Sequence, residues 1–446
     1  MVTGQLTPKM HPKEFAKRRR QLMRMMGKGS IAILPAASVK MRSRDADYPY
    51  RQDSDFYYLT GFAEPESVAA LVPGRTEGEF LMFVRDKDPK REVWDGRRAG
   101  PDEAVTEYGA DDAFPVSDID DILPGIIESC ERVYYTMGAH ADFDGRLMSW
   151  VNVLRAQGRT GTHTPDEFIA LDHLLHDLRL YKNKAEISAM RKAAKIAVAA
   201  HKRAMSICEP GKHEYEIEAE FVYEFRRNGV YPSYQPIVGS GANACVLHYN
   251  DNNDRLKDGE LLLVDAGCEF DYYASDVTRT YPINGRFTEE QRVIYDIVLE
   301  AQNAALERVV PGSMWHESHD AAVRVIARGL KRLGFINGTL ASLIRDGTYR
   351  KFFMHRTGHW LGMDVHDVGD YKVSNQWRVL EPGMVLTVEP GIYIGENQRE
   401  LAKQWRGIGI RIEDDVLVTR DGHEVLTKSL PREPKEVEAL VGSALN

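Results

Sequence analysis

Two apolar runs that predict buried strands each end in an acidic residue, and this pattern restricts the fold strongly. Residues 261–264 are followed by Asp265, and residues 384–388 are followed by Glu389. A carboxylate at the end of a buried strand is costly when ionised unless a cation, a basic partner or a raised pKa compensates for it. The two runs therefore predict a polar centre inside an otherwise apolar β structure.

A third strand separates polar and apolar side chains completely. Isoleucine occupies every second position of residues 407–413. Since side chains of a strand alternate between its two faces, the isoleucines face a core. The glycines of the opposite face leave room for close approach, and we interpret that face as a pocket wall; it carries Gly407, Gly409, Arg411 and Glu413.

A fourth acid, Asp276, lies in the strand-like run 272–281. A salt bridge or a strand-end cap explains any one of these acids, but the four share a context that calls for a common explanation. A pair of divalent cations such as Mn²⁺, Mg²⁺ or Co²⁺ supplies one, because carboxylate oxygens suit them and can bridge them. A histidine ligand would disfavour Mg²⁺. Three histidines, each of which alone is more often a core or surface residue, are close in sequence: His355, His359 and His366.

The length of 446 residues predicts two domains, because one hydrophobic core normally stops growing before that size. The first part alternates helical stretches with strand-like runs such as 31–34 and 80–84, which indicates an α/β domain over residues 1–182. A long helix over 184–205 opens the second domain, residues 183–446.

The second domain contains a weak internal repeat. A helix, a Pro-Gly pair and a second helix occur twice, with the second helices at 215–225 and 318–330, and β-rich sequence follows each time. Thr288 and Gln291 predict a capping box at the start of a helix that runs through Ile294, Ile297 and Ala301. We expect an α+β domain with pseudo-two-fold symmetry and a site at its centre.

The formal net charge of −9 disfavours a nucleic-acid partner. We interpret one basic cluster as a solvated helix face: Lys17, Arg18, Arg19, Arg20 and Arg24. No apolar run is long enough for a signal-peptide core or a membrane span. The cysteines lack a CxxC pair, which suits a reducing compartment, so we expect a cytoplasmic protein that binds no membrane.

Other reactive-looking patterns are weak. Two histidine pairs have helical spacing but no HExxH signature, and we interpret both as solvated; they are His173 with His176 and His316 with His319. No GxSxG elbow is present. The glycine-rich patch 239–241 reads as a turn, and His248, shortly after it, is placed where it can point toward the pocket.

The acids and histidines stand in the contexts VDAG, SDVTRT, HWLGMDVHD, TVEPG and GIGIRIEDD. These motifs resemble those of the creatinase-like "pita-bread" metallopeptidases, and most closely the Xaa-Pro aminopeptidases (aminopeptidase P family). The resemblance extends to residues 45–62 and 93–98, so it covers nearly the whole chain. It implies a pita-bread catalytic domain that releases the N-terminal residue of peptides with proline in the second position.

The resemblance also implies a cofactor of two divalent ions, most simply Mn²⁺, and a bridging hydroxide as nucleophile. Asp276, His359 and Glu389 would bind one ion and Asp265 the other. Asp276 and Glu413 would both be able to bridge, and Glu389 would accept the proton during attack.

Further roles follow from the same resemblance. His248 and His366 would stabilise the tetrahedral intermediate and assist proton transfer, and His355, Tyr393 and Arg411 would line the site. The strand pattern supports Arg411 independently, since it shares a face with Glu413. Relatives of this kind are dimers or tetramers in which a neighbouring subunit reaches the active site, and Asp45 and Trp94 match those contact positions.

Two alternatives remain at this stage. A prolidase-type dipeptidase would share the metal cage, and a pita-bread module without catalysis would bind peptides only. The chain also departs from its relatives in the substrate pocket: Arg356 replaces a common glycine, Asp95 replaces a common apolar residue, and the loop 371–379 is longer by a residue.

Overall fold

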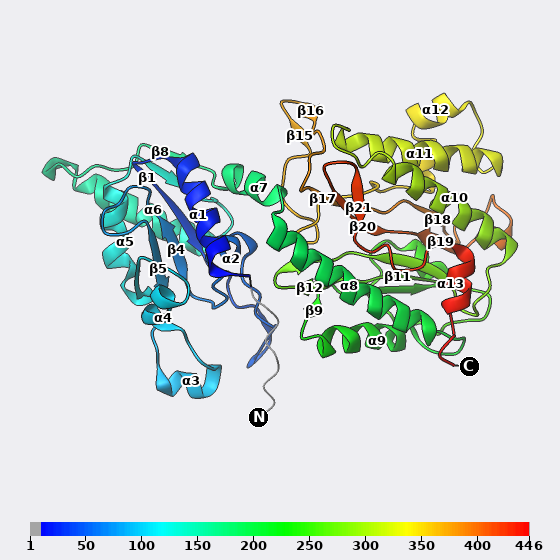
Figure 1. The fold of residues 1–446 in the computed structure, drawn as a ribbon, viewed down its shortest axis with the longest axis horizontal. Helices are drawn as coiled ribbons and strands as arrows, with labels where there is room; N and C mark the ends of the chain where they lie inside the picture. Colours follow the sequence, from blue (N-terminus) through cyan, green and yellow to red (C-terminus); the bar gives the residue numbers. More distant parts are fainter. Residues whose placement is uncertain (1–9, 446) are drawn as a thin grey trace. The chain divides into compact units, whose positions relative to one another are not determined.

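The computed structural model describes residues 10–445 and divides the chain into two compact units (Figure 1). Unit 1 is Met1–Leu178 and unit 2 is Arg179–Asn446. The sequence placed the boundary near residue 182. Each unit has its own sheets and its own hydrophobic core.

Unit 1 is an α/β domain built on a six-stranded sheet of order β6-β5-β4-β1-β7-β8. The pairs β1–β4 and β4–β5 are antiparallel, whereas β5–β6, β1–β7 and β7–β8 are parallel. The core lies between this sheet and the helices α5 and α6. The strands are β1 Ser30–Pro35, β4 Val68–Leu71, β5 Phe80–Val84, β6 Asp112–Pro115, β7 Arg132–Tyr134 and β8 Glu167–Ile169.

The remaining elements assigned to this part of the chain are mostly short. The helices are α1 Pro12–Met26, α2 Ser54–Thr60, α3 Pro89–Asp95, α4 Gly100–Thr106, α5 Ile119–Glu128, α6 Ala141–Ala156 and α7 Asp172–Leu180, with the 3₁₀ turns η1 Val116–Asp118 and η2 Gly158–Thr160. The hairpin β2 Met41–Ser43 and β3 Ala46–Asp47 stands apart from the main sheet.

The prediction of a solvated basic face on the first helix is wrong for two of its arginines. Arg18 and Arg19 of α1 are buried and donate hydrogen bonds to the carbonyl oxygens of Tyr58 and Leu59. These carbonyls lie in the last turn of α2, where helical C=O groups lack intrahelical partners and cations are favoured. Because the two guanidinium groups satisfy these carbonyl oxygens, the hydrogen bonds offset the cost of burying the two charges. Of the five basic residues, only Lys17, Arg20 and Arg24 are exposed.

Unit 2 repeats the order of helix, helix and antiparallel strands, as the sequence predicted. The helices α8 and α9 precede a sheet of order β10-β11-β14, and α10 and α11 precede a sheet of order β17-β20-β21. In Figure 1 α8 and α9 lie on one side of these strands and α10 and α11 on the other. The long helices are α8 Lys184–Ser206, α9 Glu214–Arg227, α10 Glu289–Leu306 and α11 Trp315–Arg332.

The starts of two helices show why they form where they do. Thr288 and Gln291 make the predicted capping box at α10, and Asn183 makes another with Glu186 at α8. Such reciprocal bonds satisfy backbone N–H groups that the first turn leaves unpaired. The smaller helical elements of the unit are α12 Leu340–Arg345, α13 Pro434–Leu440, η3 Gly241–Cys245, η4 Thr348–Lys351 and η5 Lys403–Trp405.

The strands of unit 2 bring distant acids to neighbouring strand ends. Asp265 pairs with Thr278 at the end of the β11–β14 ladder, and Val388 pairs with Asp414 at the end of β17–β20. Glu389 and Glu413 therefore flank that second pair. The strands are β9 Tyr231–Pro232, β10 Ile237–Ser240, β11 Leu261–Asp265, β12 Cys268–Phe270, β13 Tyr273–Ala274, β14 Thr278–Pro282, β15 Lys372–Val373, β16 Gln376–Trp377, β17 Val385–Val388, β18 Gly391–Ile394, β19 Ile408–Arg411, β20 Asp414–Val418 and β21 His423–Val425.

The run 272–281 is not the single strand that was predicted. It forms β13 and β14, and the segment between them contains Asp276. The backbone N–H of Asp276 donates to the carboxylate of Asp415 instead of to a neighbouring strand. A side-chain acceptor from a remote strand has replaced a ladder bond, which no local pattern predicts.

The glycine face of residues 407–413 is also different from the prediction. Gly409 does not line a pocket: a Cβ added there would lie 2.2 Å from the carbonyl oxygen of Ala244 in η3. The backbone of η3 occupies the space that the glycine leaves. Arg411 and Glu413, from the same face, do line the cavity described below.

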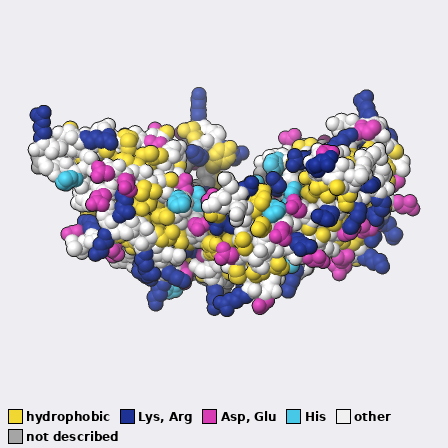
Figure 2. Space-filling view, turned by 90° about the horizontal axis from the view of Figure 1, so that it is seen from above, with side chains coloured by type: hydrophobic (Ala, Val, Ile, Leu, Met, Phe, Trp, Pro, Cys, Tyr) yellow, Lys and Arg dark blue, Asp and Glu magenta, His cyan; other side chains and the backbone are white. Residues whose placement is uncertain are grey.

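The face shown in Figure 2 carries Lys and Arg side chains interspersed with Asp and Glu. No helix within residues 10–445 is both long and apolar enough to cross a membrane.

Gly409→Ala should lower the free energy of unfolding by about 1–3 kcal/mol, because overpacking against fixed backbone cannot be relieved by a side-chain rotation. Gly239→Ala is a matched control against the same turn, since its Cβ would lie 3.0 Å from the carbonyl oxygen of Asn243. Chemical unfolding of both variants measures the difference. A Gly409→Ala variant as stable as the wild type would contradict the prediction, because it would show that η3 moves away easily.

Candidate functional site

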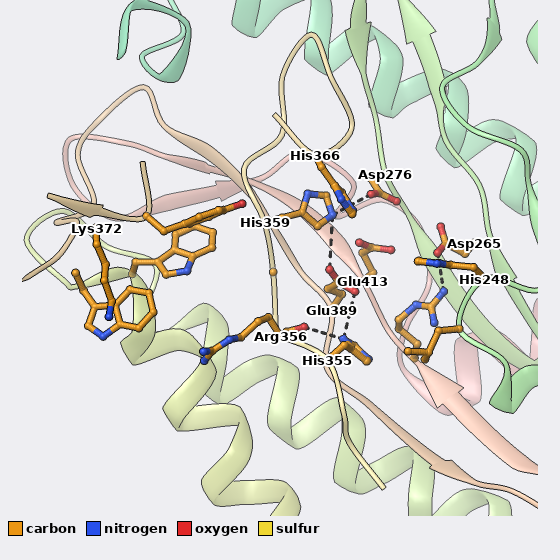
Figure 3. A pocket seen from close by; sticks show the side chains of 16 residues that line it. His248, Asp265, Asp276, His355, Arg356, His359, His366, Lys372, Glu389 and Glu413 are labelled. Atoms are coloured by element: carbon orange, nitrogen blue, oxygen red, sulfur yellow. Dashed lines mark hydrogen bonds and ion pairs between the residues drawn. The ribbon is translucent and has the colours of Figure 1, made fainter. Parts of the chain in front are cut away.

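A cavity of about 620 Å³ in unit 2 contains most of the residues singled out in the sequence. Its walls come from both halves of the repeat (Figure 3). The predicted residues that line it are His248, Asp265, Asp276, His355, His359, His366, Glu389, Arg411 and Glu413.

The four acids reach the cavity from strand ends. Asp265 is the last residue of β11, and Asp276 lies between β13 and β14. Glu389 follows β17 directly, and Glu413 lies between β19 and β20. A strand end can turn its side chain out of the ladder while the apolar strand itself anchors the backbone. The acids therefore meet although they are far apart in sequence.

His359 lies between two of these acids. Its Nε2 is 3.3 Å from Oδ2 of Asp276 and 3.6 Å from Oε1 of Glu389, as the dashed lines of Figure 3 show. Its Nδ1 is 2.9 Å from the carbonyl oxygen of Trp360, so Nδ1 carries the proton that it donates. A ring held in this tautomer presents Nε2 as a metal ligand.

Arg411 and His359 balance only part of the charge of the four acids. Burial and repulsion by the other acids raise the pKa of Glu413 well above its ordinary value. Burial likewise raises the pKa of Glu389 to about 7, although His359 and Arg411 oppose the shift. Burial lowers the pKa of His359, but Asp276 and Glu389 outweigh this effect and raise it to about 9. The cluster attracts positive charge strongly.

This donor set fits divalent metal ions. Ligand atoms of Asp276, His359 and Glu413 all lie within 4.8 Å of one another, and Asp265 and Glu389 border the same cavity. Carboxylate oxygens together with one imidazole nitrogen suit Mn²⁺, Co²⁺, Fe²⁺ or Zn²⁺. Bound cations would supply the positive charge that the raised carboxyl pKa values indicate is missing.

Arg411 and Thr278 hold the acids in position. The Arg411 guanidinium donates to Oδ2 of Asp265 at 2.6 Å and to Oγ1 of Thr278 at 3.1 Å. Thr278 in turn donates to Oε2 of Glu413 at 2.6 Å. Arg411 is the cation that sequence patterning placed beside Glu413, and its contact with Asp265 crosses from one half of the repeat to the other.

Tyr234 is a site residue that sequence reasoning missed. Its hydroxyl lies 2.5 Å from Oδ1 of Asp265 and 2.6 Å from Oδ1 of Asp276. Burial and the neighbouring acids raise the pKa of its phenol well above the ordinary value, so it remains a donor. The segment around Tyr234 carries no local motif, and only its position before β10 brings it to the two acids.

His355 belongs to a chain of hydrogen bonds behind the acids. Arg411 donates to the hydroxyl of Tyr393, which lies 2.8 Å from Nε2 of His355, and Nδ1 of His355 is 2.7 Å from the carbonyl oxygen of Arg356. Burial and Arg411 lower the pKa of His355 to about 3, so its ring is neutral. Tyr393 is buried and is not among the residues that line the cavity.

His248 and His366 line the cavity with exposed side chains. The rings of His366 and His359 lie 4.1 Å apart between centroids. No hydrogen bond to the ring nitrogens of His248 or His366 comes from residues 10–445. Both rings are therefore available to a ligand.

Asp45 and Trp94 lie in unit 1, whereas the cavity is lined by unit 2. Asp45 occupies the tight turn between β2 and β3 with a positive φ of 58°, and Trp94 lies in α3 with 84% of its surface exposed.

The interpretation of His316 and His319 as solvated is wrong, because both are half-buried on α11. Nδ1 of His319 lies 2.8 Å from Oγ1 of Thr357, and His316 stacks on Trp377. In the other pair His173 is exposed, and His176 lies 3.4 Å from a carboxylate oxygen of Asp55. Neither histidine pair lines the cavity.

Aromatic and basic residues form the rest of the cavity wall. Trp315, Tyr371 and Trp377 contribute rings, and Arg356 and Lys372 contribute cations. Four of these five correspond to the departures noted in the sequence: Arg356, and Tyr371, Lys372 and Trp377 of the loop 371–379. No sequence pattern pointed to Trp315.

Two family models match the chain. Metallopeptidase family M24 matches residues 188–420, and the N-terminal domain of aminopeptidase P matches residues 15–134. The first match contains all five predicted metal ligands. The two matches correspond to the two units of the structure.

Relatives match over nearly the whole chain. "Xaa-Pro aminopeptidase" of Escherichia coli is 46% identical over 97% of this chain and 98% of its own length. The protein of the same name from Haemophilus influenzae is 40% identical, again over 97% and 98% of the two chains. The solved structure of Pseudomonas aeruginosa aminopeptidase PepP is 58% identical, with a TM-score of 0.97 over 98% of this chain and 100% of that chain. The cavity of carboxylates, the family matches and these relatives together show that this chain belongs to metallopeptidase family M24, with the N-terminal domain of aminopeptidase P.

Proposed function

We propose that this protein is a metal-dependent aminopeptidase that releases the N-terminal residue from peptides with proline in the second position. The observation that carries the proposal is the convergence of four acids and His359 on one cavity, in a chain that matches Xaa-Pro aminopeptidases over 97% of its length. A dipeptidase acting only on Xaa-Pro is the alternative that the metal cage alone does not separate.

Two divalent ions, which we propose to be Mn²⁺, would be held by Asp265, Asp276, His359, Glu389 and Glu413. Two ions balance the surplus negative charge of four acids better than one. Such a pair, when bound, lowers the pKa of a water molecule and polarises the scissile carbonyl group. Arg411 and Tyr234 would keep the ligands in position, since both contact the carboxylate of Asp265.

The remaining residues have complementary tasks. Glu389 borders the cavity and would accept the proton of the attacking water. His248 and His366 would donate hydrogen bonds to the oxygen on which charge develops and move a proton toward the leaving proline nitrogen. Neutral His355 would contact the substrate while Tyr393 and Arg411 hold its orientation.

We further propose that the protein acts as a homodimer or homotetramer in the cytoplasm. The helix α3 has no buried residue, and Val93 and Trp94 expose more than 80% of their surfaces at its end. Large apolar side chains displayed in this way mark a protein interface. The four cysteines are unpaired, which suits a reducing compartment.

The substrate assignment predicts how three peptides behave with Mn²⁺-loaded protein. A tripeptide Xaa-Pro-Yaa should be cleaved between Xaa and Pro, a matched Xaa-Ala-Yaa should be cleaved much more slowly, and chelation with EDTA should abolish turnover. Release of the free N-terminal residue, followed by chromatography, measures all three. Cleavage of the dipeptide Xaa-Pro but not of the tripeptide would establish the dipeptidase instead.

Glu389→Ala and His248→Ala should both lose activity, but for different reasons. Glu389→Ala removes a ligand and should bind less Mn²⁺, with kcat/KM reduced by about 100-fold or more. His248→Ala should retain the metal content of the wild type and lose roughly 100-fold in rate, as expected when one transition-state donor is removed. Metal analysis beside kinetics separates the two, and wild-type hydrolysis by Glu389→Ala would contradict the assigned cage.

Glu413→Gln should stabilise the metal-free protein by about 0.5–2 kcal/mol at pH 8, because it removes one of four repelling carboxylates. A raised pKa means that the folded state holds the proton more tightly than the unfolded state. The wild type therefore loses stability as pH rises from about 4.5, the ordinary value, and the difference between the proteins should widen from pH 5 to pH 8.

With saturating Mn²⁺ the wild type should be more stable than Glu413→Gln, because the variant lacks a charged ligand for the metal. Thermal unfolding at both pH values, with EDTA or Mn²⁺, makes the comparison. A variant that is less stable than the wild type without metal would show that Glu413 is not repelled by its neighbours.

A further inference from the structure

The cavity that contains the metal ligands has a second end of opposite charge. Arg356 and Lys372 line it together with the four acids, and Figure 3 shows these two cations on the side away from Asp265 and Asp276. Ring side chains contribute the wall near the cations. The cavity is therefore polarised, with carboxylates at one end and cations at the other.

Neither cation is neutralised by the protein. Arg356 and Lys372 are exposed, and no residue within 10–445 forms an ion pair with either. Their contacts are with one ring: the Arg356 guanidinium carbon lies 5.8 Å and the Lys372 ammonium nitrogen 4.3 Å from the centroid of Trp377. Two cations that share a neutral aromatic ring keep their full charge for a ligand.

The backbone holds these groups in place. Lys372 and Trp377 are paired residues of the β15–β16 hairpin, so their side chains stand on the same face. Ser374 and Asn375 form its two-residue turn with φ of 50° and 63°, the conformation that matches the twist of a tight hairpin. On the other side, the carbonyl of Arg356 is fixed by the bond from His355.

The wall between the two ends is aromatic and rigid. Trp315 packs against Tyr371 with ring centroids 4.7 Å apart and against Trp360 at 4.1 Å, and Trp360 is fully buried. Apolar walls suit the body of a peptide and strengthen charge interactions beside them. A segment held along this wall would have its far end next to Arg356 and Lys372.

We propose that Arg356, Lys372 and Trp377 form a subsite for a carboxylate on the leaving side of the peptide. This inference rests on the proposed aminopeptidase function, which places the N-terminal residue at the metal cage and the remainder of the peptide along the cavity. The carboxylate is either the C-terminus of a short peptide or an acidic side chain shortly after the proline. The subsite thus selects substrates by length or by acidic sequence.

Two pairs of peptides distinguish the sources of the carboxylate. Ala-Pro-Ala with a free C-terminus is compared with its C-terminal amide, and amidated Ala-Pro-Glu is compared with amidated Ala-Pro-Gln. For wild-type protein loaded with Mn²⁺ we expect kcat/KM to be about tenfold higher for the charged member of at least one pair, mainly through KM. Raising the ionic strength should reduce the preference, because the cations are exposed.

The double variant Arg356→Gln, Lys372→Gln should bring that ratio to about one. Arg324→Gln, which removes an exposed cation of α11 outside the cavity, is the matched control and should keep the wild-type ratio. A purely structural contact with Trp377 would change both members of a pair equally. The ratio therefore reports the subsite and not general damage.

Each outcome decides the proposal. A preference in the first pair alone identifies the C-terminal carboxylate, and one in the second pair alone identifies an acidic side chain, provided that the double variant loses it. Cleavage without any preference, or a preference that survives in the double variant, overturns the subsite and leaves the aminopeptidase function intact. Failure to cleave any of the four peptides overturns the aminopeptidase function, and the subsite with it.

Discussion

The repulsion among four acids in one cavity is the constraint around which unit 2 is organised. Asp265, Asp276, Glu389 and Glu413 arrive from separate strand ends, and each is at least partly removed from water. Desolvation and mutual repulsion oppose the ionisation of three of them, as their raised carboxyl pKa values show. Such a cluster is stable only if cations or hydrogen-bond donors contact its carboxylates. Arg411, Thr278 and Tyr234 supply such contacts here.

The supports are themselves buried and connected. Arg279, fully buried behind the site, donates to the carbonyl oxygen of Glu413 and pairs with Asp414 at 2.8 Å. Asp414 also accepts from Gln302 of α10. A buried ion pair of this kind is strongly destabilising to break, because removing one partner leaves an isolated charge. Helix α10 is in this way connected to the strand end that carries Glu413.

A second buried group secures the loop with His359 and His366. The carboxylate of Asp367 accepts from Arg179 at 2.6 Å and from Lys182 at 2.9 Å. Burial raises the pKa of Asp367, but these two cations outweigh that effect and keep it below its ordinary value. The supports of the acid cluster and the supports of the loop that carries His359 and His366 are thus separate.

The sequence by itself determined the local elements and the ligand types. Period-two alternation placed Arg411 and Glu413 on one face, apolar runs ending in Asp265 and Glu389 marked strand ends, and capping residues located the start of α10. These signals are local, because they depend on side-chain spacing along one segment. The roles of Asp276 and His359 rested mainly on resemblance to a family.

Only the tertiary structure decided which groups meet. Tyr234 contacts two acids from a loop without a motif, and the backbone of η3 fills the space beside Gly409. The carboxylate of Asp415 accepts a hydrogen bond from the backbone N–H of Asp276, in the segment between β13 and β14. Arg18 and Arg19 are buried because another helix end needs their hydrogen bonds. The cationic end of the cavity joins Arg356 to a hairpin that begins at Lys372. In each case the partner is remote in sequence, and contacts between remote segments leave no periodic signal in either one.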